Sequence, residues 1–131
     1  MNSDLLFVYG TLRRTCTTGA HAKYLRDAVF IGAGKISGKL YQVSYYPALT
    51  LEGQNPTWVI GEIYRLDDPQ QLLRLDAYEE CSHPPQPGQE YHRRRVQVAG
   101  DDGVIFTAWT YVYQLPTDHL SLIASGDFLN P

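Results

Sequence analysis

Hydrophobic and polar positions along this chain follow strand periods more often than helical ones. The apolar run at residues 5–9 predicts a short buried strand, and residues 57–66 alternate as a half-buried strand does. Residues 91–100 and 104–113 flank an Asp-Asp-Gly sequence, which is typical of a β-hairpin. Three glycines interrupt residues 29–43, so we expect two separate extended pieces there.

Helical patterns are fewer. Residues 67–80 carry the clearest one, because Asp68 can cap the N-terminus and Pro69 suits the first helical position. A shorter helix is expected within residues 19–26, whereas Pro47 predicts a loop because proline has no amide for a strand ladder. Since strands outnumber helices and do not alternate regularly with them, we expect an α+β fold with a mixed or antiparallel sheet that can close on itself.

Length and composition narrow the class of protein. The 131 residues fit one domain over 1–131, and a hydrophobic content of 44% excludes an intrinsically disordered chain. No apolar stretch approaches the roughly 18 residues of a membrane span, and the first residues lack the features of a signal peptide. We therefore expect a cytoplasmic protein with no membrane partner. The net charge of −3 argues against a nucleic-acid partner.

Cysteines and histidines indicate no metal site. Cys16 and Cys81 predict two free thiols rather than a disulfide framework, and no histidine lies in an HExxH or paired-cysteine arrangement. Cys81 and His83 raise the alternative of a hydrolase with a thiol nucleophile, although spacing alone does not make such a pair. The glycine-rich residues 32–38 lack both the P-loop ending and the dinucleotide-binding spacing.

Acidic residues in the predicted helix suggest proton-transfer chemistry. Glu79 falls on the same helical stripe as Leu72 and Leu75, near a C-terminus where the macrodipole disfavours negative charge, and Asp76 lies close to that face. A partly desolvated carboxyl there has a raised pKa and is suited to moving a proton near neutral pH. The alternative is that the helix frays and both Glu79 and Glu80 reach water.

Charged residues of the predicted strands have ordinary interpretations. Glu62 alternates with apolar and aromatic positions, and the favoured interpretation is that this is the solvent face of its strand. Arg93 and Arg95 face opposite to Arg94, which favours a solvated or ion-paired surface over an anion site.

The first strand ends in Tyr9-Gly10-Thr11-Leu12, which can present successive main-chain amides. Gly10 leaves room for close approach, and such amides can form a concavity that binds a carboxylate or phosphate. The alternative is an ordinary glycine between a strand and a loop. Arg13 and Arg14, which follow, are expected to be solvated or to guide an anionic substrate.

Several motifs together resemble a known family. From residue 7 to residue 128 the chain contains, in order, FVYGTLRR, YPAL, GEIYRLD, LDAYE, YHRRRV, YVY and SGDF. This series resembles the gamma-glutamylcyclotransferase-like family, and within it the gamma-glutamylamine cyclotransferase and AIG2-like branch. The resemblance implies a small mixed β-barrel flanked by helices, with a pocket at one end of the barrel.

The same resemblance assigns roles to individual residues. It implies that Tyr9, Gly10, Thr11 and Leu12 hold the glutamyl part of the substrate largely through backbone groups, and that Glu79 is the general acid and base. Tyr91 and Arg93 match a Tyr-x-Arg motif and are candidates for shaping the pocket.

The implied activity is conversion of a small gamma-glutamyl compound to 5-oxoproline and a free amine, by a monomer or weak dimer and without metal or cofactor. A non-catalytic module that binds a small carboxylate or a peptide end is the alternative from a different class. The chain departs from the family in a longer proline-rich insertion between Glu80 and Glu90, which could change the amine that is accepted.

Overall fold

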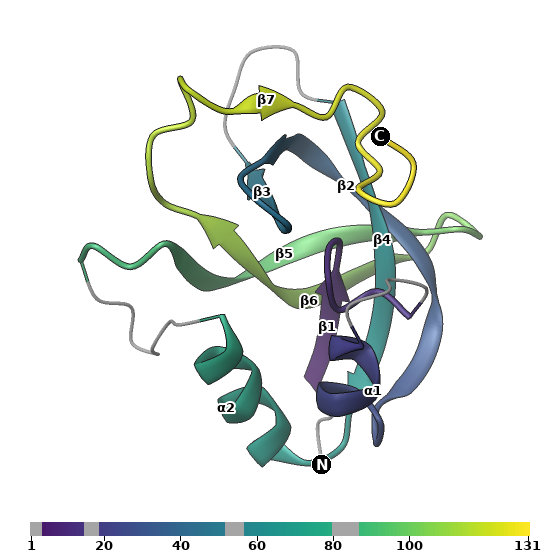
Figure 1. The fold of residues 1–131 in the computed structure, drawn as a ribbon. Coiled ribbons are helices and arrows are strands. Elements are labelled where there is room, and N and C mark those ends of the chain that lie inside the picture. Colours follow the sequence, from purple (N-terminus) through teal and green to yellow (C-terminus); the bar gives the residue numbers. More distant parts are fainter. Residues whose placement is uncertain (1–3, 15–18, 52–56, 80–86) are drawn as a thin grey trace.

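The computed structural model describes residues 4–14, 19–51, 57–79 and 87–131. Its main feature is a barrel of β1 (Asp4–Val8), β2 (Val29–Gln42), β4 (Thr57–Leu66), β5 (Tyr91–Gly100) and β6 (Ile105–Tyr113). These strands lie in the order β2-β4-β1-β6-β5, and β5 pairs back onto β2, which closes the sheet (Figure 1). The β1–β6 pairing is parallel and the other barrel pairings are antiparallel, so the predicted mixed β-barrel is confirmed.

Two helices, α1 (Ala20–Tyr24) and α2 (Pro69–Tyr78), lie on the same side of the barrel, whereas the short strands β3 (Pro47–Thr50) and β7 (Ser121–Leu122) pair with β2 on the other side (Figure 1). Helix α2 begins as predicted, because the Asp68 side chain accepts a hydrogen bond of 2.9 Å from the Gln70 amide. In the described part of the chain, neither helix has the length and apolar character needed to cross a bilayer.

Two sequence predictions about extended structure are wrong. Strand β2 is continuous rather than two pieces, because the ladder with β4 absorbs a register shift between Phe30 and Gly32 and then resumes. Pro47 begins β3 instead of lying in a loop. A proline is tolerated there because it is the first residue of a strand at the edge of the sheet.

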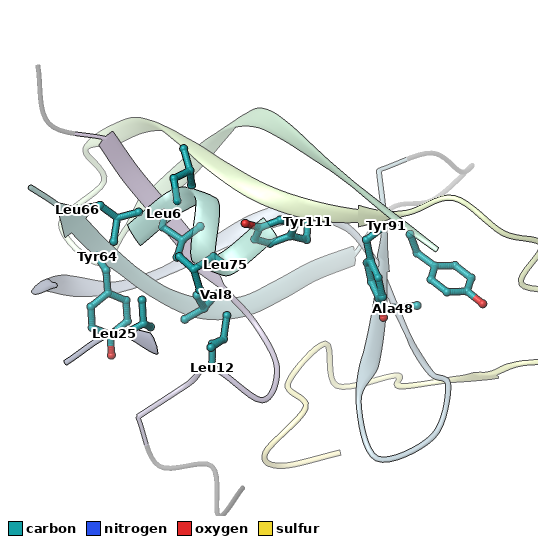
Figure 2. Close-up of a cluster of buried hydrophobic side chains, with 12 residues drawn as sticks. Leu6, Val8, Leu12, Leu25, Ala48, Tyr64, Leu66, Leu75, Tyr91 and Tyr111 are labelled. Atoms are coloured by element: carbon teal, nitrogen blue, oxygen red, sulfur yellow. The ribbon is translucent and has the colours of Figure 1, made fainter. Parts of the chain in front are cut away.

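Buried side chains form two clusters that share β1. Leu6 and Val8 belong to one cluster, and Phe7 between them belongs to the other, so β1 is buried on both faces. Tyr64 and Tyr91 lie in opposite parts of the first cluster, with Tyr111 between them (Figure 2). The strand that leads into the Tyr9–Leu12 loop is therefore a fixed central element of the fold.

Candidate active site

A cavity of about 490 Å³ lies where the end of β1, the end of α2 and the start of β5 meet. Six of the predicted site residues line it: Tyr9, Gly10, Thr11, Leu12, Glu79 and Tyr91. Arg93, the seventh, is buried but is not part of this lining. The fold thus brings the loop after β1 to the same cavity as a carboxyl some seventy residues further along the chain.

The loop after β1 is a tight turn. The Arg13 amide donates to the Gly10 carbonyl at 3.0 Å, and in such a turn the amides of the two central residues, Thr11 and Leu12, take no part in the turn's own bond. A Cβ atom on residue 10 would lie 2.7 Å from ring carbons of Pro47, another lining residue, so glycine is required for steric reasons. The hydroxyls of Thr11 and Tyr78 lie 2.7 Å apart and join this turn to the end of α2.

Two predicted site tyrosines form fixed walls of the cavity. The Tyr9 hydroxyl donates to the Tyr111 carbonyl, and the Tyr91 hydroxyl donates to the Pro47 carbonyl at 2.7 Å. Burial raises the pKa of both phenols well above the ordinary value, and nearby charges add to the effect. Both side chains therefore stay neutral and act as hydrogen-bond donors.

Glu79 is the C-cap residue of helix α2. Its amide donates to the Leu75 carbonyl at 2.9 Å, so the last turn is intact up to this residue rather than frayed. Burial raises the pKa of its carboxyl from 4.5 to about 8, and the negative charges of Glu90 and Asp76 add to the shift. Among the residues that the structure describes, this carboxyl has no hydrogen-bond or ion-pair partner. It is available to a ligand in the cavity.

Arg93 lies next to the cavity lining but is not part of it. Its guanidinium forms a buried ion pair of 3.0 Å with Asp76 and lies 4.4 Å above the Trp109 ring. Asp76 also accepts a hydrogen bond of 2.8 Å from the hydroxyl of Tyr111, which lines the cavity. Any influence of Arg93 on the cavity therefore passes through Asp76 and its neighbours, and the shaping role implied for it stays a prediction.

The structure overturns two interpretations of charged residues. Glu62 is only 6% exposed and is not on a solvent face, because it accepts hydrogen bonds from Arg13 Nε (3.3 Å), the Arg14 amide (3.0 Å) and the Tyr64 hydroxyl (2.8 Å). Arg13 is not solvated either, since its Nη1 also meets Asp127 Oδ1 at 2.6 Å. The residues after the turn and the C-terminal segment cover this face of β4.

Glu90 and Tyr46 are cavity residues to which no pattern in the sequence assigned a role. Both line the cavity, and the Tyr46 hydroxyl lies 2.8 and 3.0 Å from the two carboxylate oxygens of Glu90. Tyr46 is the first residue of the YPAL motif and Glu90 directly precedes YHRRRV, two motifs that carried the family resemblance, but the two residues lie 44 positions apart and no local pattern predicts their contact.

Some candidates lie outside the described residues. These are Cys16, Glu80, Cys81 and His83, together with most of the proline-rich insertion. The hypothesis of a thiol nucleophile is therefore untested. Within the four described ranges, no group of three or more His, Cys, Asp or Glu residues is arranged to hold a metal ion.

Comparison with known proteins identifies the family of this chain. Residues 6–130 match the family model described as gamma-glutamyl cyclotransferase, AIG2-like. The gamma-glutamylcyclotransferase family protein YtfP of Escherichia coli K12 is 35% identical over 126 residues, which are 95% of this chain and 96% of YtfP.

Solved structures show the same fold. An AIG2-like protein from Mus musculus superimposes with a TM-score of 0.74 at 26% identity, over 100% of this chain and 97% of the mouse chain. YkqA from Bacillus subtilis superimposes with a TM-score of 0.73 at 27% identity, over 97% of this chain but 40% of YkqA.

Proposed function

Because the chain belongs to the gamma-glutamyl cyclotransferase, AIG2-like family, we propose that it converts a small gamma-glutamyl amine to 5-oxoproline and the free amine, with Glu79 as general acid and base. One observation carries this proposal: Glu79 has a carboxyl without a partner among the described residues, and it lines the same cavity as the Tyr9–Leu12 turn.

The cavity suits a substrate of this kind. Its volume of about 490 Å³ lies in the range of small-molecule sites. Within the described part of the chain, no Lys, Arg or His belongs to the lining. The α-carboxylate of a glutamyl group would therefore be held by main-chain amides of the Gly10–Leu12 turn rather than by a cation.

The reaction needs a folded substrate and a proton carrier. The α-amine attacks the γ-carbonyl carbon of the same glutamyl group, a new C–N bond closes the five-membered lactam, and the C–N bond to the leaving amine breaks. Because the nucleophile is part of the substrate, the cavity has to hold the chain in the attacking conformer.

Glu79 transfers protons from the α-ammonium group to the leaving nitrogen in this proposal. The lactam nitrogen keeps one of the three protons of the α-ammonium group, and the other two pass to the leaving nitrogen, which departs as an ammonium ion. A carboxyl whose pKa is about 8 can accept a proton from the α-ammonium and return it to the leaving amine near neutral pH. Amides of the turn would also stabilise negative charge on the carbonyl oxygen during attack.

The substitution Glu79→Gln tests this proposal. We expect release of 5-oxoproline from a panel of gamma-glutamyl amines and dipeptides to fall by about 100-fold or more, because proton transfer is lost while the shape of the side chain is kept. Circular dichroism checks that the variant is folded, and Asp101→Asn, which removes an exposed carboxylate at the far end of β5, is the matched control.

Unchanged turnover in Glu79→Gln would contradict the role of this residue. If the unmodified protein binds compounds of the panel but releases no 5-oxoproline from any of them, the chain is instead a non-catalytic binding module on the same fold.

A further inference from the structure

The cavity holds a second carboxylate, Glu90, for which the proposed reaction has no use. Glu90 directly precedes β5 and lies in the lining with Glu79. Its position is fixed through the main chain, because its carbonyl accepts a hydrogen bond of 2.8 Å from the Gln114 amide.

Tyr46 orients the side-chain carboxylate of Glu90. The hydroxyl of Tyr46 contacts both carboxylate oxygens, and its ring packs against those of Tyr45 and Tyr91 at centroid distances of 5.0 and 6.2 Å. A carboxylate has about four lone-pair sites, and a single hydroxyl hydrogen fills one of them. Glu90 is thus oriented at the cavity and keeps the capacity to accept hydrogen bonds from a ligand.

Charge is unbalanced in this cavity. The described lining residues contain two carboxylates, Glu79 and Glu90, and no Lys, Arg or His. Glu79 and Glu90 line the same cavity, and the negative charge of Glu90 contributes to the raised pKa of Glu79. In the proposed reaction, Glu79 meets the α-ammonium of the substrate, and Glu90 is left without a cationic partner.

Building on the proposed function, we propose that Glu90, oriented by Tyr46, selects gamma-glutamyl substrates whose leaving amine carries a second positive charge, that is, gamma-glutamyl diamines. A second ammonium group supplies the charge that the lining lacks and donates charge-assisted hydrogen bonds to Glu90. A leaving group with a carboxylate, as in a gamma-glutamyl dipeptide, would meet like charge in the cavity. The preference arises from repulsion of the wrong substrate as well as attraction of the right one.

Three substrates of similar length test this inference: mono-gamma-glutamyl-1,4-diaminobutane, gamma-glutamyl pentylamine and gamma-glutamyl-4-aminobutyrate. We expect kcat/KM for 5-oxoproline release to favour the diamine over the neutral compound by about 10-fold or more, and the anionic compound to be the poorest, as expected for a charged hydrogen bond. In Glu90→Gln the ratio between diamine and neutral compound should fall close to one.

The ratio is the informative quantity, because any effect of Glu90→Gln on the proton transfer of Glu79 acts on both substrates and cancels. Asp101→Asn removes an equal charge at the exposed tip of the β5–β6 hairpin and should leave the ratio unchanged. A ratio near one in the unmodified protein, or an equal ratio in Glu90→Gln, overturns the inference.

Calorimetric binding separates this inference from the proposed function. If no compound yields 5-oxoproline, the proposed cyclotransferase activity fails, and binding of the same three compounds decides the role of Glu90. Tighter binding of the diamine that is lost in Glu90→Gln supports charge selection. Equal binding of the three compounds, or no binding, overturns it.

Discussion

At the scale of single residues, the site depends on a carboxyl in an unfavourable place. Glu79 stands at the C-terminus of α2, where the helix dipole disfavours negative charge, and its burial and the charges of Glu90 and Asp76 act in the same direction. No described residue offers a compensating cation or hydrogen bond. A sequence tolerates such a local cost where a group must exchange protons near neutral pH.

The pH dependence of activity follows from this environment. The free enzyme must hold Glu79 as a carboxylate to accept the proton of the α-ammonium, so kcat/KM should rise with pH through an ascending limb at about 8. Glu90→Gln removes a negative charge that raises this pKa, so the limb should move to lower pH. The measurement is the pH profile of 5-oxoproline release from gamma-glutamyl pentylamine.

Asp101→Asn is the control for this profile, because Asp101 is exposed and is not part of the cavity lining. The limb of this variant should coincide with that of the unmodified protein. An ascending limb near 4.5, the ordinary value for glutamate, would show that Glu79 is not desolvated or that another group governs the step.

At the scale of elements, the position of Glu79 depends on how α2 is fastened to the barrel. Asp76, in the last turn of the helix, is bound by Arg93 of β5 and by Tyr111 of β6. Asp76 and Arg93 are both almost fully buried, so each is the counter-charge that the other needs. This arrangement fixes the helix end at which the Glu79 carboxyl meets the cavity.

Asp76→Ala should therefore be strongly destabilising. It leaves the Arg93 guanidinium buried without a counter-charge, and we expect the free energy of unfolding to fall by about 3–5 kcal/mol in urea denaturation. Asp67→Ala is the matched control, because it breaks an ion pair of 2.9 Å with Arg65 that is roughly half exposed. That change should cost less than about 1 kcal/mol. Similar losses in the two variants would show that Arg93 does not depend on Asp76.

Elements set by local periodicity were predictable from the sequence. Alternation predicted β4 and the β5–β6 hairpin, and the cap at Asp68 predicted the start of α2. The continuity of β2 and the strand that begins at Pro47 were not predictable, because each depends on the partner strand beside it.

The site was predictable only in part for the same reason. The resemblance named residues that the fold gathers around one cavity, whereas local patterns could not show that distant segments bury Glu62 or that Tyr46 contacts Glu90. Arg13 and Asp127, which meet over β4, are separated by 114 positions. The closed barrel brings such distant segments into contact, and no pattern within a single segment predicts those contacts.

At the scale of the whole molecule, the C-terminal segment connects β2 and β4 with the residues that follow β1. The Ile123 amide donates to the Leu40 carbonyl at 2.7 Å, and the Ile60 amide donates to the Gly126 carbonyl at 2.8 Å. The next residue, Asp127, binds Arg13 directly after the turn that lines the cavity. The last residues therefore hold together β2, β4 and Arg13, which follows the Tyr9–Leu12 turn.

Gly126 is the position on which this attachment depends most. Its φ of +70° is in the left-handed region, and a Cβ atom there would lie 1.9 Å from the Trp58 carbonyl oxygen. Main chain rather than a flexible side chain stands in the way, so Gly126→Ala can be relieved only by moving the segment away from β4. We expect a loss of about 3 kcal/mol or more in the free energy of unfolding, measured by urea denaturation.

Gly103→Ala separates the conformational cost of a positive φ from the steric cost of the close contact with main chain. Its φ is +83°, but no atom lies within 4 Å of the added Cβ, so it should show only the conformational cost of about 1–2 kcal/mol. Equal losses in the two variants would contradict the close packing of the segment on β4. Because Asp127 follows Gly126 and holds Arg13, Gly126→Ala should also lower kcat/KM at a temperature where it remains folded. Full activity at that temperature would mean that the C-terminal segment stabilises the barrel without positioning the Tyr9–Leu12 turn.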